Sequence, residues 1–171
     1  QGNASNESDT QNFTKGSIRR MRAEVMFDAI NNVTENTEKF SRMERGKGAV
    51  QIYDGRVSNY FLSTFGRAKR DSVCSCEVVM DPSLSQALHL LNGDTVNNKV
   101  VSGAVVKKLL AAKKTPREIT DELYLRTFAR KPTAAEWVKL EPFFKDEKKL
   151  ETTLNDLFWS LLNSKEFMFN H

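Results

Sequence analysis

The sequence predicts a mainly α-helical fold, a compact antiparallel helical bundle with an irregular, partly extended loop region in its N-terminal half. Apolar side chains recur at helical spacing through most of the C-terminal half. Two capping boxes, which start at Thr115 and Thr133, mark the beginnings of helices. Of the 171 residues, 39% are hydrophobic and 28% are charged, a composition typical of a globular protein.

The chain divides by composition into a polar tail and one domain. Residues 1–16 are rich in Asn, Ser, Thr and Gln and hold one aromatic residue, Phe13. Such a segment buries too little apolar surface to order itself, so we expect a tail or linker that is held against a partner. Phe13 is a candidate contact in that interface. Residues 17–171 are expected to form a single helical domain, the C-terminal module of a larger protein.

The N-terminal half carries mixed signals. A first helix is expected at residues 18–31, capped by Ser17, and a short helix is expected after Asn36. Three glycines between residues 44 and 56 predict a loop in which Val50, Ile52 and Tyr53 are extended. One or two helical turns at 58–65 are expected to stop at Gly66, and residues 73–80 are expected to be extended.

The C-terminal half carries clearer helix signals, because caps and apolar periodicity agree there. The expected helices lie at about residues 83–92, from 94 or 95 onward, at 104–113, from 115 to 129, from 133 to 144 and from 154 to 167. Short turns between successive helices favour antiparallel packing. The aromatic residues of this half, Phe143 and Phe144 among them, are interpreted as core.

Cys74 and Cys76, in the order Cys-Ser-Cys, are the only cysteines of the chain. A zinc site with His89 as a third ligand is one interpretation, although zinc sites usually hold cysteines two to four residues apart and a second pair. A redox pair would require Cys-x-x-Cys spacing. The interpretation we favour is a structural disulfide, to each other or to a neighbouring segment, and no metal site is expected.

His89 lies in the leucine-rich segment that precedes the polar run Asn92-Gly93-Asp94-Thr95. A lone histidine between leucines is typical of a core or interface side chain, whereas a catalytic triad or a cysteine–histidine pair would have to be built around it. A helix that ends at Gly93 and another that Asp94 caps explain the polar run as a corner between helices. The functional alternative is a polar site that gathers His89, Asn92, Asp94 and Asn97.

The C-terminus is unusually apolar for a free chain end. Phe167, Met168 and Phe169 are expected to pack back on the domain or to contact a partner. The net charge of +4 is scattered among acidic residues instead of gathering on one stripe, so no nucleic-acid partner is expected. No apolar run approaches the ~20 residues that a membrane-spanning helix needs.

Several segments of the chain resemble the domain of unknown function, family 1553, the C-terminal domain of large planctomycete and verrucomicrobial proteins. These segments are YFL at 60–62, TFGR at 64–67, VCSCE at 73–77, PSLSQALHLLNGDTVN at 82–97, ELYLRT at 122–127, RKPT at 130–133 and LLNSKEF at 161–167. Together they extend the resemblance over about residues 17–171. Residue 78 is Val where the family pattern has Arg, so no anion-binding role is carried over to this position.

The resemblance implies a particular context. In such proteins a cytochrome c-like domain and another domain of unknown function usually precede this one, after an export signal. This implies an extracytoplasmic location, periplasmic or at the cell surface, and an association with electron transfer or surface polysaccharide processing. No cofactor is expected in this chain, because any haem c would belong to the preceding domains.

These features together predict a non-catalytic helical interaction module of an exported multidomain protein. It would pack against sister domains or subunits in an oligomer or a hetero-assembly. The alternative is part of an enzyme, polysaccharide-related or redox, whose site is completed by N-terminal domains. A deep pocket lined jointly by Cys74, Cys76, His89, Asn92 and Asp94 would favour the enzyme.

Overall fold

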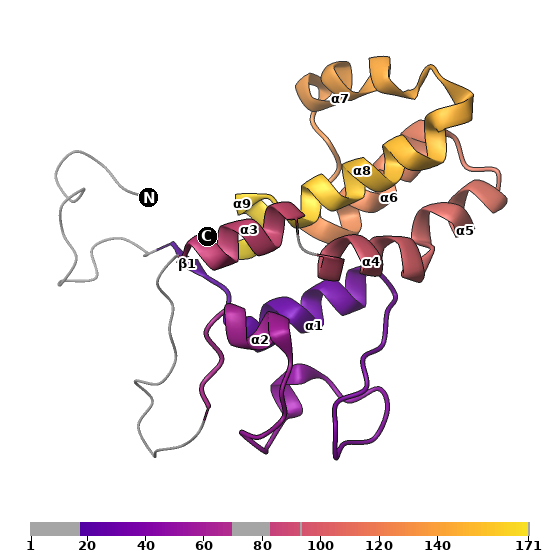
Figure 1. The fold of residues 1–171 in the computed structure, drawn as a ribbon. Coiled ribbons are helices and arrows are strands. Elements are labelled where there is room, and N and C mark those ends of the chain that lie inside the picture. Colours follow the sequence, from indigo (N-terminus) through magenta and orange to yellow (C-terminus); the bar gives the residue numbers. More distant parts are fainter. Residues whose placement is uncertain (1–17, 70–82, 93, 171) are drawn as a thin grey trace, which may run out of the picture.

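The structure of the protein is a computed structural model that describes residues 18–69, 83–92 and 94–170. Its described part is mainly α-helical, as predicted, and its N-terminal half contains the expected irregular loops (Figure 1). The elements are β1 (Arg19–Arg20), α1 (Ala23–Val33), η1 (Ala49–Gln51), α2 (Tyr60–Thr64), α3 (Leu84–Asn92), α4 (Asp94–Gly103), α5 (Val105–Ala111), α6 (Pro116–Phe128), α7 (Ala134–Leu140), η3 (Glu141–Phe144), η4 (Glu147–Lys149), α8 (Leu150–Leu162), α9 (Lys165–Met168) and β2 (Phe169–Asn170).

One contiguous cluster of buried side chains runs through these elements. Helix α1 packs against α2, α4 and η1, and α8 packs against α4, α5 and α6. The largest fully buried side chains come from both halves, and Phe27, Phe61, Phe65 and Phe158 lead them in size. Phe27 and Phe61 contact each other with ring centroids 5.2 Å apart. Residues 73–80, which were expected to be extended, lie outside the described part.

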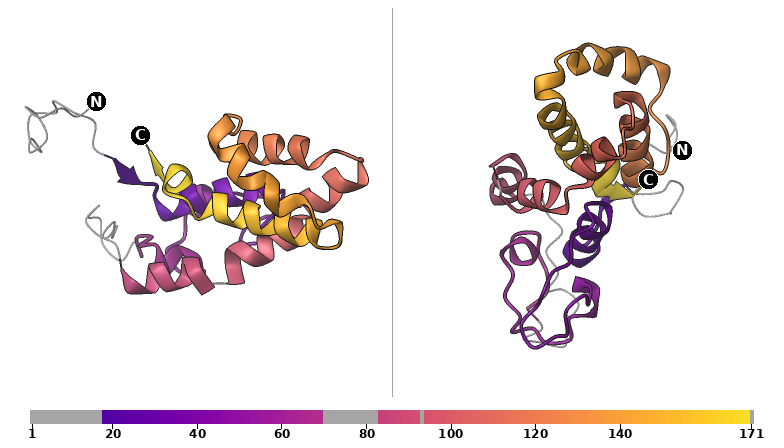
Figure 2. Two further views of the ribbon diagram at one scale, coloured as in Figure 1. Left: turned by 90° about the horizontal axis from the view of Figure 1, so that it is seen from above. Right: turned by 90° about the vertical axis from the view of Figure 1, so that its right-hand side faces the viewer.

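The first helix begins later than predicted. Residues 19 and 20 form β1, which pairs antiparallel with β2, so that Arg19 lies opposite Asn170 and Arg20 opposite Phe169 (Figure 2, left). The Met21 amide continues the pairing by donating to the Met168 carbonyl at 2.9 Å. Helix α1 therefore starts only at Ala23, because pairing with the C-terminus overrides the local helix signal.

The short helix predicted after Asn36 is absent from the described residues 34–48. Helix α1 ends at Val33, and Glu35 follows in a left-handed conformation with φ of 55°. The Asn36 side chain then donates to the Thr34 and Lys99 carbonyls and accepts from Ser102. A Cβ atom on Gly103 would overlap the Thr34 carbonyl oxygen, so glycine permits this close approach of α4 to the end of α1.

The loop between α1 and α2 is anchored by Asp28. Its two carboxylate oxygens accept hydrogen bonds from the Ala49 amide at 2.6 Å and the Val50 amide at 3.0 Å. These bonds fix a 3₁₀ turn at 49–51, so Val50 is not extended as predicted, whereas Ile52 is extended and buried. Helix α2 then ends at Thr64, and Gly66, whose φ is 81°, follows as the predicted stop.

Local capping chemistry sets the helix starts of the C-terminal half. In both predicted capping boxes the threonine amide donates to the glutamate carboxylate at 2.7 Å. The glutamate amide in turn donates to the threonine hydroxyl at 3.3 Å. Pro116 occupies the first turn of α6, where a missing amide hydrogen costs nothing. The start signals at Thr115 and Thr133 are therefore confirmed.

The last predicted helix is divided in two. Helix α8 ends at Leu162, and the Ser164 hydroxyl accepts a hydrogen bond from the Phe167 amide to start α9. The turn directs Phe167 and Met168 back into the core, where they are 7% and 8% exposed. Of the two alternatives for the apolar C-terminus, the structure shows packing on the chain itself. Phe169 is half-buried beside them.

Candidate functional site

Of the four residues of the predicted polar site, only His89 and Asn97 have side chains in the described part of the structure. His89 is buried, and its ring lies edge-on to those of Tyr60, Phe61 and Phe65 at centroid distances of 5.1 to 5.9 Å. Asn97 is exposed on α4. Helix α3 ends at Asn92 and α4 begins at Asp94, so one helix stops and another starts there, but the side chains of these two residues lie outside the described part.

Other predicted residues also fall outside the described part of the chain. Cys74, Cys76 and Phe13 are among them, so the disulfide and the tail contact stay predictions. Among the residues that are described, no three His, Cys, Asp or Glu side chains are grouped as metal ligands. None of the helices in this part is long and apolar enough to cross a bilayer.

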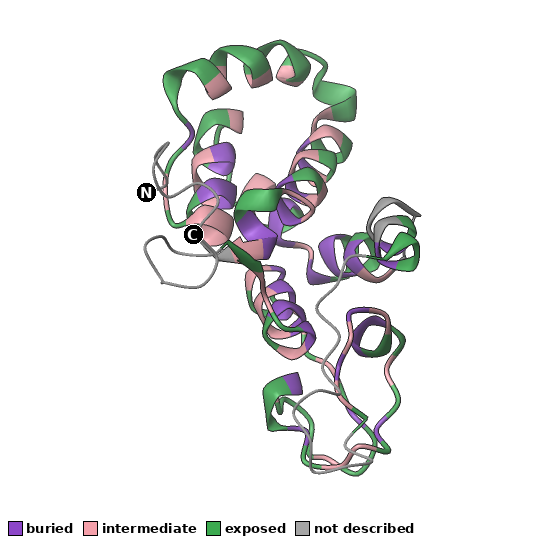
Figure 3. Cartoon of the chain, turned by 90° about the vertical axis from the view of Figure 1, so that its left-hand side faces the viewer, coloured by how far each residue is buried: buried purple, intermediate pink, exposed green. Residues whose placement is uncertain are grey.

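The most distinctive surface of the described residues is the segment that we call the α7–η3 arm, residues 134–144. The arm arches over α6 and α8 (Figure 2, right), and neither α7 nor η3 buries a single residue. Figure 3 accordingly shows it in green and pink, without purple. Val138 and Phe143 are each 67% exposed, which corrects the prediction that Phe143 belongs to the core.

The arm has a small amount of internal packing. The Trp137 and Phe144 rings stack with centroids 5.9 Å apart, and the Arg117 guanidinium of α6 lies 4.2 Å from the centre of the Trp137 ring. A cation over an indole face is attracted to the ring electrostatically, and this contact joins the arm to α6. Leu140 and Phe144 of the arm are also partly buried against the core, so apolar, polar and cation–π contacts together position the arm.

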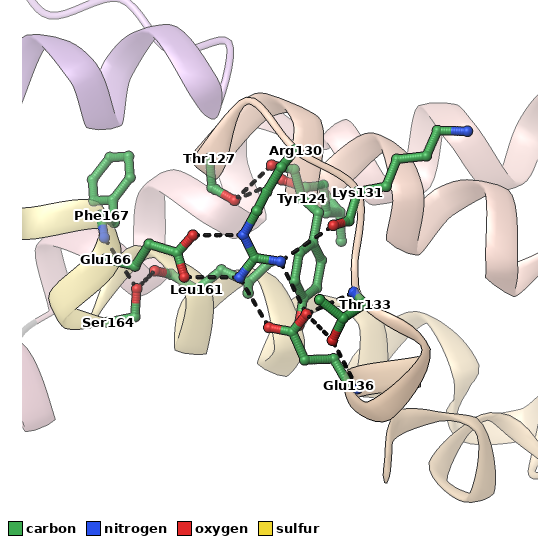
Figure 4. A network of polar contacts seen from close by, with 11 residues as sticks. Tyr124, Thr127, Arg130, Lys131, Thr133, Glu136, Leu161, Ser164, Glu166 and Phe167 are labelled. Atoms are coloured by element: carbon green, nitrogen blue, oxygen red, sulfur yellow. Dashed lines mark hydrogen bonds and ion pairs between the residues drawn. The ribbon is translucent and has the colours of Figure 1, made fainter. Parts of the chain in front are cut away.

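Arg130 supplies the strongest of these polar contacts (Figure 4). It lies between the end of α6 and the start of α7, and its guanidinium donates to Glu136 of α7 at 2.9 and 3.0 Å. The same group donates to Glu166 of α9 at 2.7 and 2.8 Å. It also lies 5.5 Å from the centre of the Tyr124 ring and 5.4 Å from that of Phe128. We call Arg130, Glu136 and Glu166 the Arg130 clamp.

The clamp shifts the pKa values of its members. The hydrogen bonds from Arg130, joined by the one from the Thr133 amide, lower the pKa of Glu136 to about 2. The pKa of Arg130 is raised, first by Glu166 and then by Glu136. Glu136 and Arg130 are therefore charged at neutral pH, and two carboxylates on different elements share one planar cation. The arrangement joins the segment after α6 to α7 and to α9.

Two further ion-pair groups fasten the loop after α1 to α4, α5 and α6. Glu35 accepts from Lys108 of α5 and from Arg126 of α6, each at 2.7 Å, and these bonds lower the pKa of its carboxyl. Lys99 of α4 donates to Glu38 at 2.8 Å, and its ammonium lies 4.7 Å from the centre of the Phe27 ring. Like the clamp, these groups join elements that are distant in sequence.

Sequence reasoning missed the clamp, although its parts lie in notable segments. Arg130 begins the RKPT segment, Glu136 closes the second capping box, and Glu166 lies in the LLNSKEF segment near the chain end. The Thr133 box did point to Glu136 as a helix-start residue. Nothing in a single sequence pairs Arg130 with Glu166, which is 36 residues away.

Comparisons with known proteins identify a family for the chain but supply no activity. No curated protein and no solved structure is significantly similar to the chain. A family model described as "Protein of unknown function (DUF1553)" matches residues 1–144, which includes the whole α7–η3 arm. Since the match covers most of the 171 residues, the chain belongs to this family of proteins of unknown function.

Proposed function

We propose that this chain is a non-catalytic interaction module and that the α7–η3 arm is its main contact surface. The observation that carries the proposal is that no residue of this arm is fully buried, although Leu140 and Phe144 pack partly against the core, and that Val138 and Phe143 are exposed to solvent. Covering a side chain of this kind stabilises an interface by roughly 1.5–3 kcal/mol. The clamp holds the arm in one position, which reduces the entropy that binding would cost.

The proposed setting is an exported multidomain protein. In it the module packs against sister domains or subunits outside the cytoplasm, in a cell-surface or electron-transfer assembly. Haem c, where present, would belong to the preceding domains. Membership of a family of unknown function fits this setting but supplies no activity. The position of His89 among three aromatic rings supports a packing role for that residue in preference to a catalytic one.

The test replaces both apolar side chains of the arm in the natural protein. Val138→Ser with Phe143→Ser removes the proposed contacts without touching the core, so circular dichroism and melting temperature should be preserved. Val101→Ser is the matched control, because Val101 is 61% exposed on α4 and lies outside the arm. The mass of the assembly, measured by light scattering after size exclusion, should fall for the double variant and stay constant for the control.

A double variant that folds normally and keeps the full assembly mass would overturn the proposal. So would an equal loss of mass in Val101→Ser, because the effect would then belong to any exposed apolar residue.

A further inference from the structure

A polar hollow lies on the α2 side of the molecule, away from the α7–η3 arm. Its volume is about 530 Å³, and it is lined by the loop 54–59, by one side of α2 and by residues 67–69. Cavities of roughly 300–1,000 Å³ are the size that small-molecule ligands occupy. Only Val57, Leu62 and Ala68 contribute apolar side chains to the lining.

The walls of the hollow are held by Arg67, whose side chain is 5% exposed. Its guanidinium donates to the Val57 carbonyl at 3.0 Å and to the Asp54 carbonyl at 3.2 Å, and it lies 3.7 Å from a Glu24 oxygen. These bonds fix the loop 54–57 against the end of α2. The backbone of this wall of the hollow is therefore held by a buried side chain.

The charges around the hollow are unbalanced in favour of cations. Arg56 and Lys69 line it and are exposed, and the buried Arg67 lies beneath them. The one acidic lining residue, Asp54, is already engaged by the Arg42 guanidinium at 3.0 Å and by the Arg56 amide at 2.9 Å. Asp54 is thus partly compensated by these contacts, and Arg56 and Lys69 are the exposed cations of the lining.

Neutral donors accompany the two cations. The Ser58 side chain lines the hollow and is exposed, and Asn59 lies between the loop and α2. Ser63 also lines the hollow, but its hydroxyl donates to the Tyr60 carbonyl at 3.0 Å. Asn59 uses its Oδ1 to cap α2 by accepting from the Leu62 amide at 3.1 Å. Its Nδ2 donates to none of the described residues and lies on the lining. Donors from separate walls suit a group that offers several acceptor oxygens.

From this arrangement we infer that the hollow lined by Arg56, Lys69, Ser58 and Asn59 binds a tetrahedral oxyanion, a phosphate or sulfate group, free or carried on a small hydrophilic molecule. The site is separate from the α7–η3 arm, and the inference does not depend on the proposed interaction role. The lack of an aromatic platform in the lining favours recognition of the charged group over stacking of a ring.

The experiment titrates the chain with inorganic phosphate and with sulfate, and follows amide shifts by ¹H–¹⁵N NMR. Sodium chloride at matched ionic strength and glucose serve as the ionic and the neutral control. Saturable shifts confined to residues 54–69 are expected with at least one oxyanion, and comparison of the two titrations shows whether phosphate or sulfate is preferred. Arg56→Gln with Lys69→Gln should weaken binding at least about tenfold, because two charge-assisted contacts are lost.

Lys47→Gln is the matched control, since Lys47 is an exposed cation of the same irregular region that does not line the hollow. It should leave the affinity unchanged. Both exposed substitutions preserve Arg67, so the fold should survive, and an unchanged spectrum outside residues 54–69 would confirm this. The inference is overturned if neither oxyanion gives saturable shifts beyond those of chloride. It is equally overturned if the double variant binds as tightly as the unaltered chain.

Discussion

Replacing Arg130 with Met should loosen the α7–η3 arm and lower the free energy of unfolding. Arg130 makes two bidentate pairs, but its side chain and those of its carboxylate partners are each about one-third exposed (35%, 33% and 39%), so solvent screens them. Each such pair contributes about 0.2–1 kcal/mol, and the contacts with Tyr124 and Phe128 add about 0.5–1 kcal/mol. The expected loss is therefore about 1–3 kcal/mol, increased by repulsion between the two carboxylates left behind.

Urea unfolding at neutral pH and low salt measures this loss directly. Lys131→Met is the matched control, because Lys131 is the next residue, is 66% exposed and makes one ion pair, with Asp121 at 3.3 Å. The control should lose no more than about 0.5 kcal/mol. If Arg130→Met is no more destabilising than Lys131→Met, the clamp does not hold the arm and the reasoning fails.

Three further predictions concern the core and the clamp. Gly103→Ala should lower the free energy of unfolding, measured in urea, by about 3 kcal/mol, because the added Cβ would collide with the Thr34 backbone and no side-chain rotation would relieve the clash. A loss below about 1 kcal/mol would show that the ends of α1 and α4 separate easily. Phe167→Ala should lower the free energy of unfolding of the isolated chain by about 3 kcal/mol, since the chain itself buries this side chain. A destabilisation that is seen only in an assembly would contradict this expectation. The unaltered chain should have a larger free energy of unfolding than Glu136→Gln, and this difference should have its full size above pH about 4.5. It should shrink as the pH falls toward 2, because folding lowers the pKa of Glu136 from 4.5 to about 2. A difference that is constant over this range would show that the clamp does not keep Glu136 ionised.

Local signals in the sequence predicted the helix starts well. A capping box satisfies two backbone amides within four residues, so Thr115 and Thr133 specify their helix starts without help from the rest of the chain. Gly66 likewise marks the end of α2, because its φ of 81° favours glycine. These positions are predictable because cause and effect lie within one turn of chain.

Signals that depend on distant partners were misread. Residues 18–22 have helical periodicity, but pairing with the C-terminal residues 168–170 makes part of them a strand. Phe143 has the spacing of a core residue, yet the arm that carries it arches away from the core. The hollow beside α2 depends on Arg67 reaching two carbonyls more than nine residues earlier, which no periodicity reports.

In the candidate sites, too, features set by neighbouring residues are predictable from the sequence, whereas contacts between distant residues are not. The leucines that flank His89 in a helical segment favour packing among apolar groups, and the structure buries this side chain beside three aromatic rings. The clamp was not foreseen, since charged residues on the surface of a helix give no pattern that names their partners. Arg117 over Trp137 was missed for the same reason.

Hydrogen–deuterium exchange of the natural assembly, compared with that of this chain alone, tests most directly whether the α7–η3 arm is a contact surface. Amides of residues 134–144 should exchange more slowly in the assembly, because a partner would cover an arm that the chain leaves exposed. Amides of α1, already packed in the core, should exchange at the same rate in both samples and serve as the internal reference. Equal exchange of the arm in the two samples would contradict the proposed role.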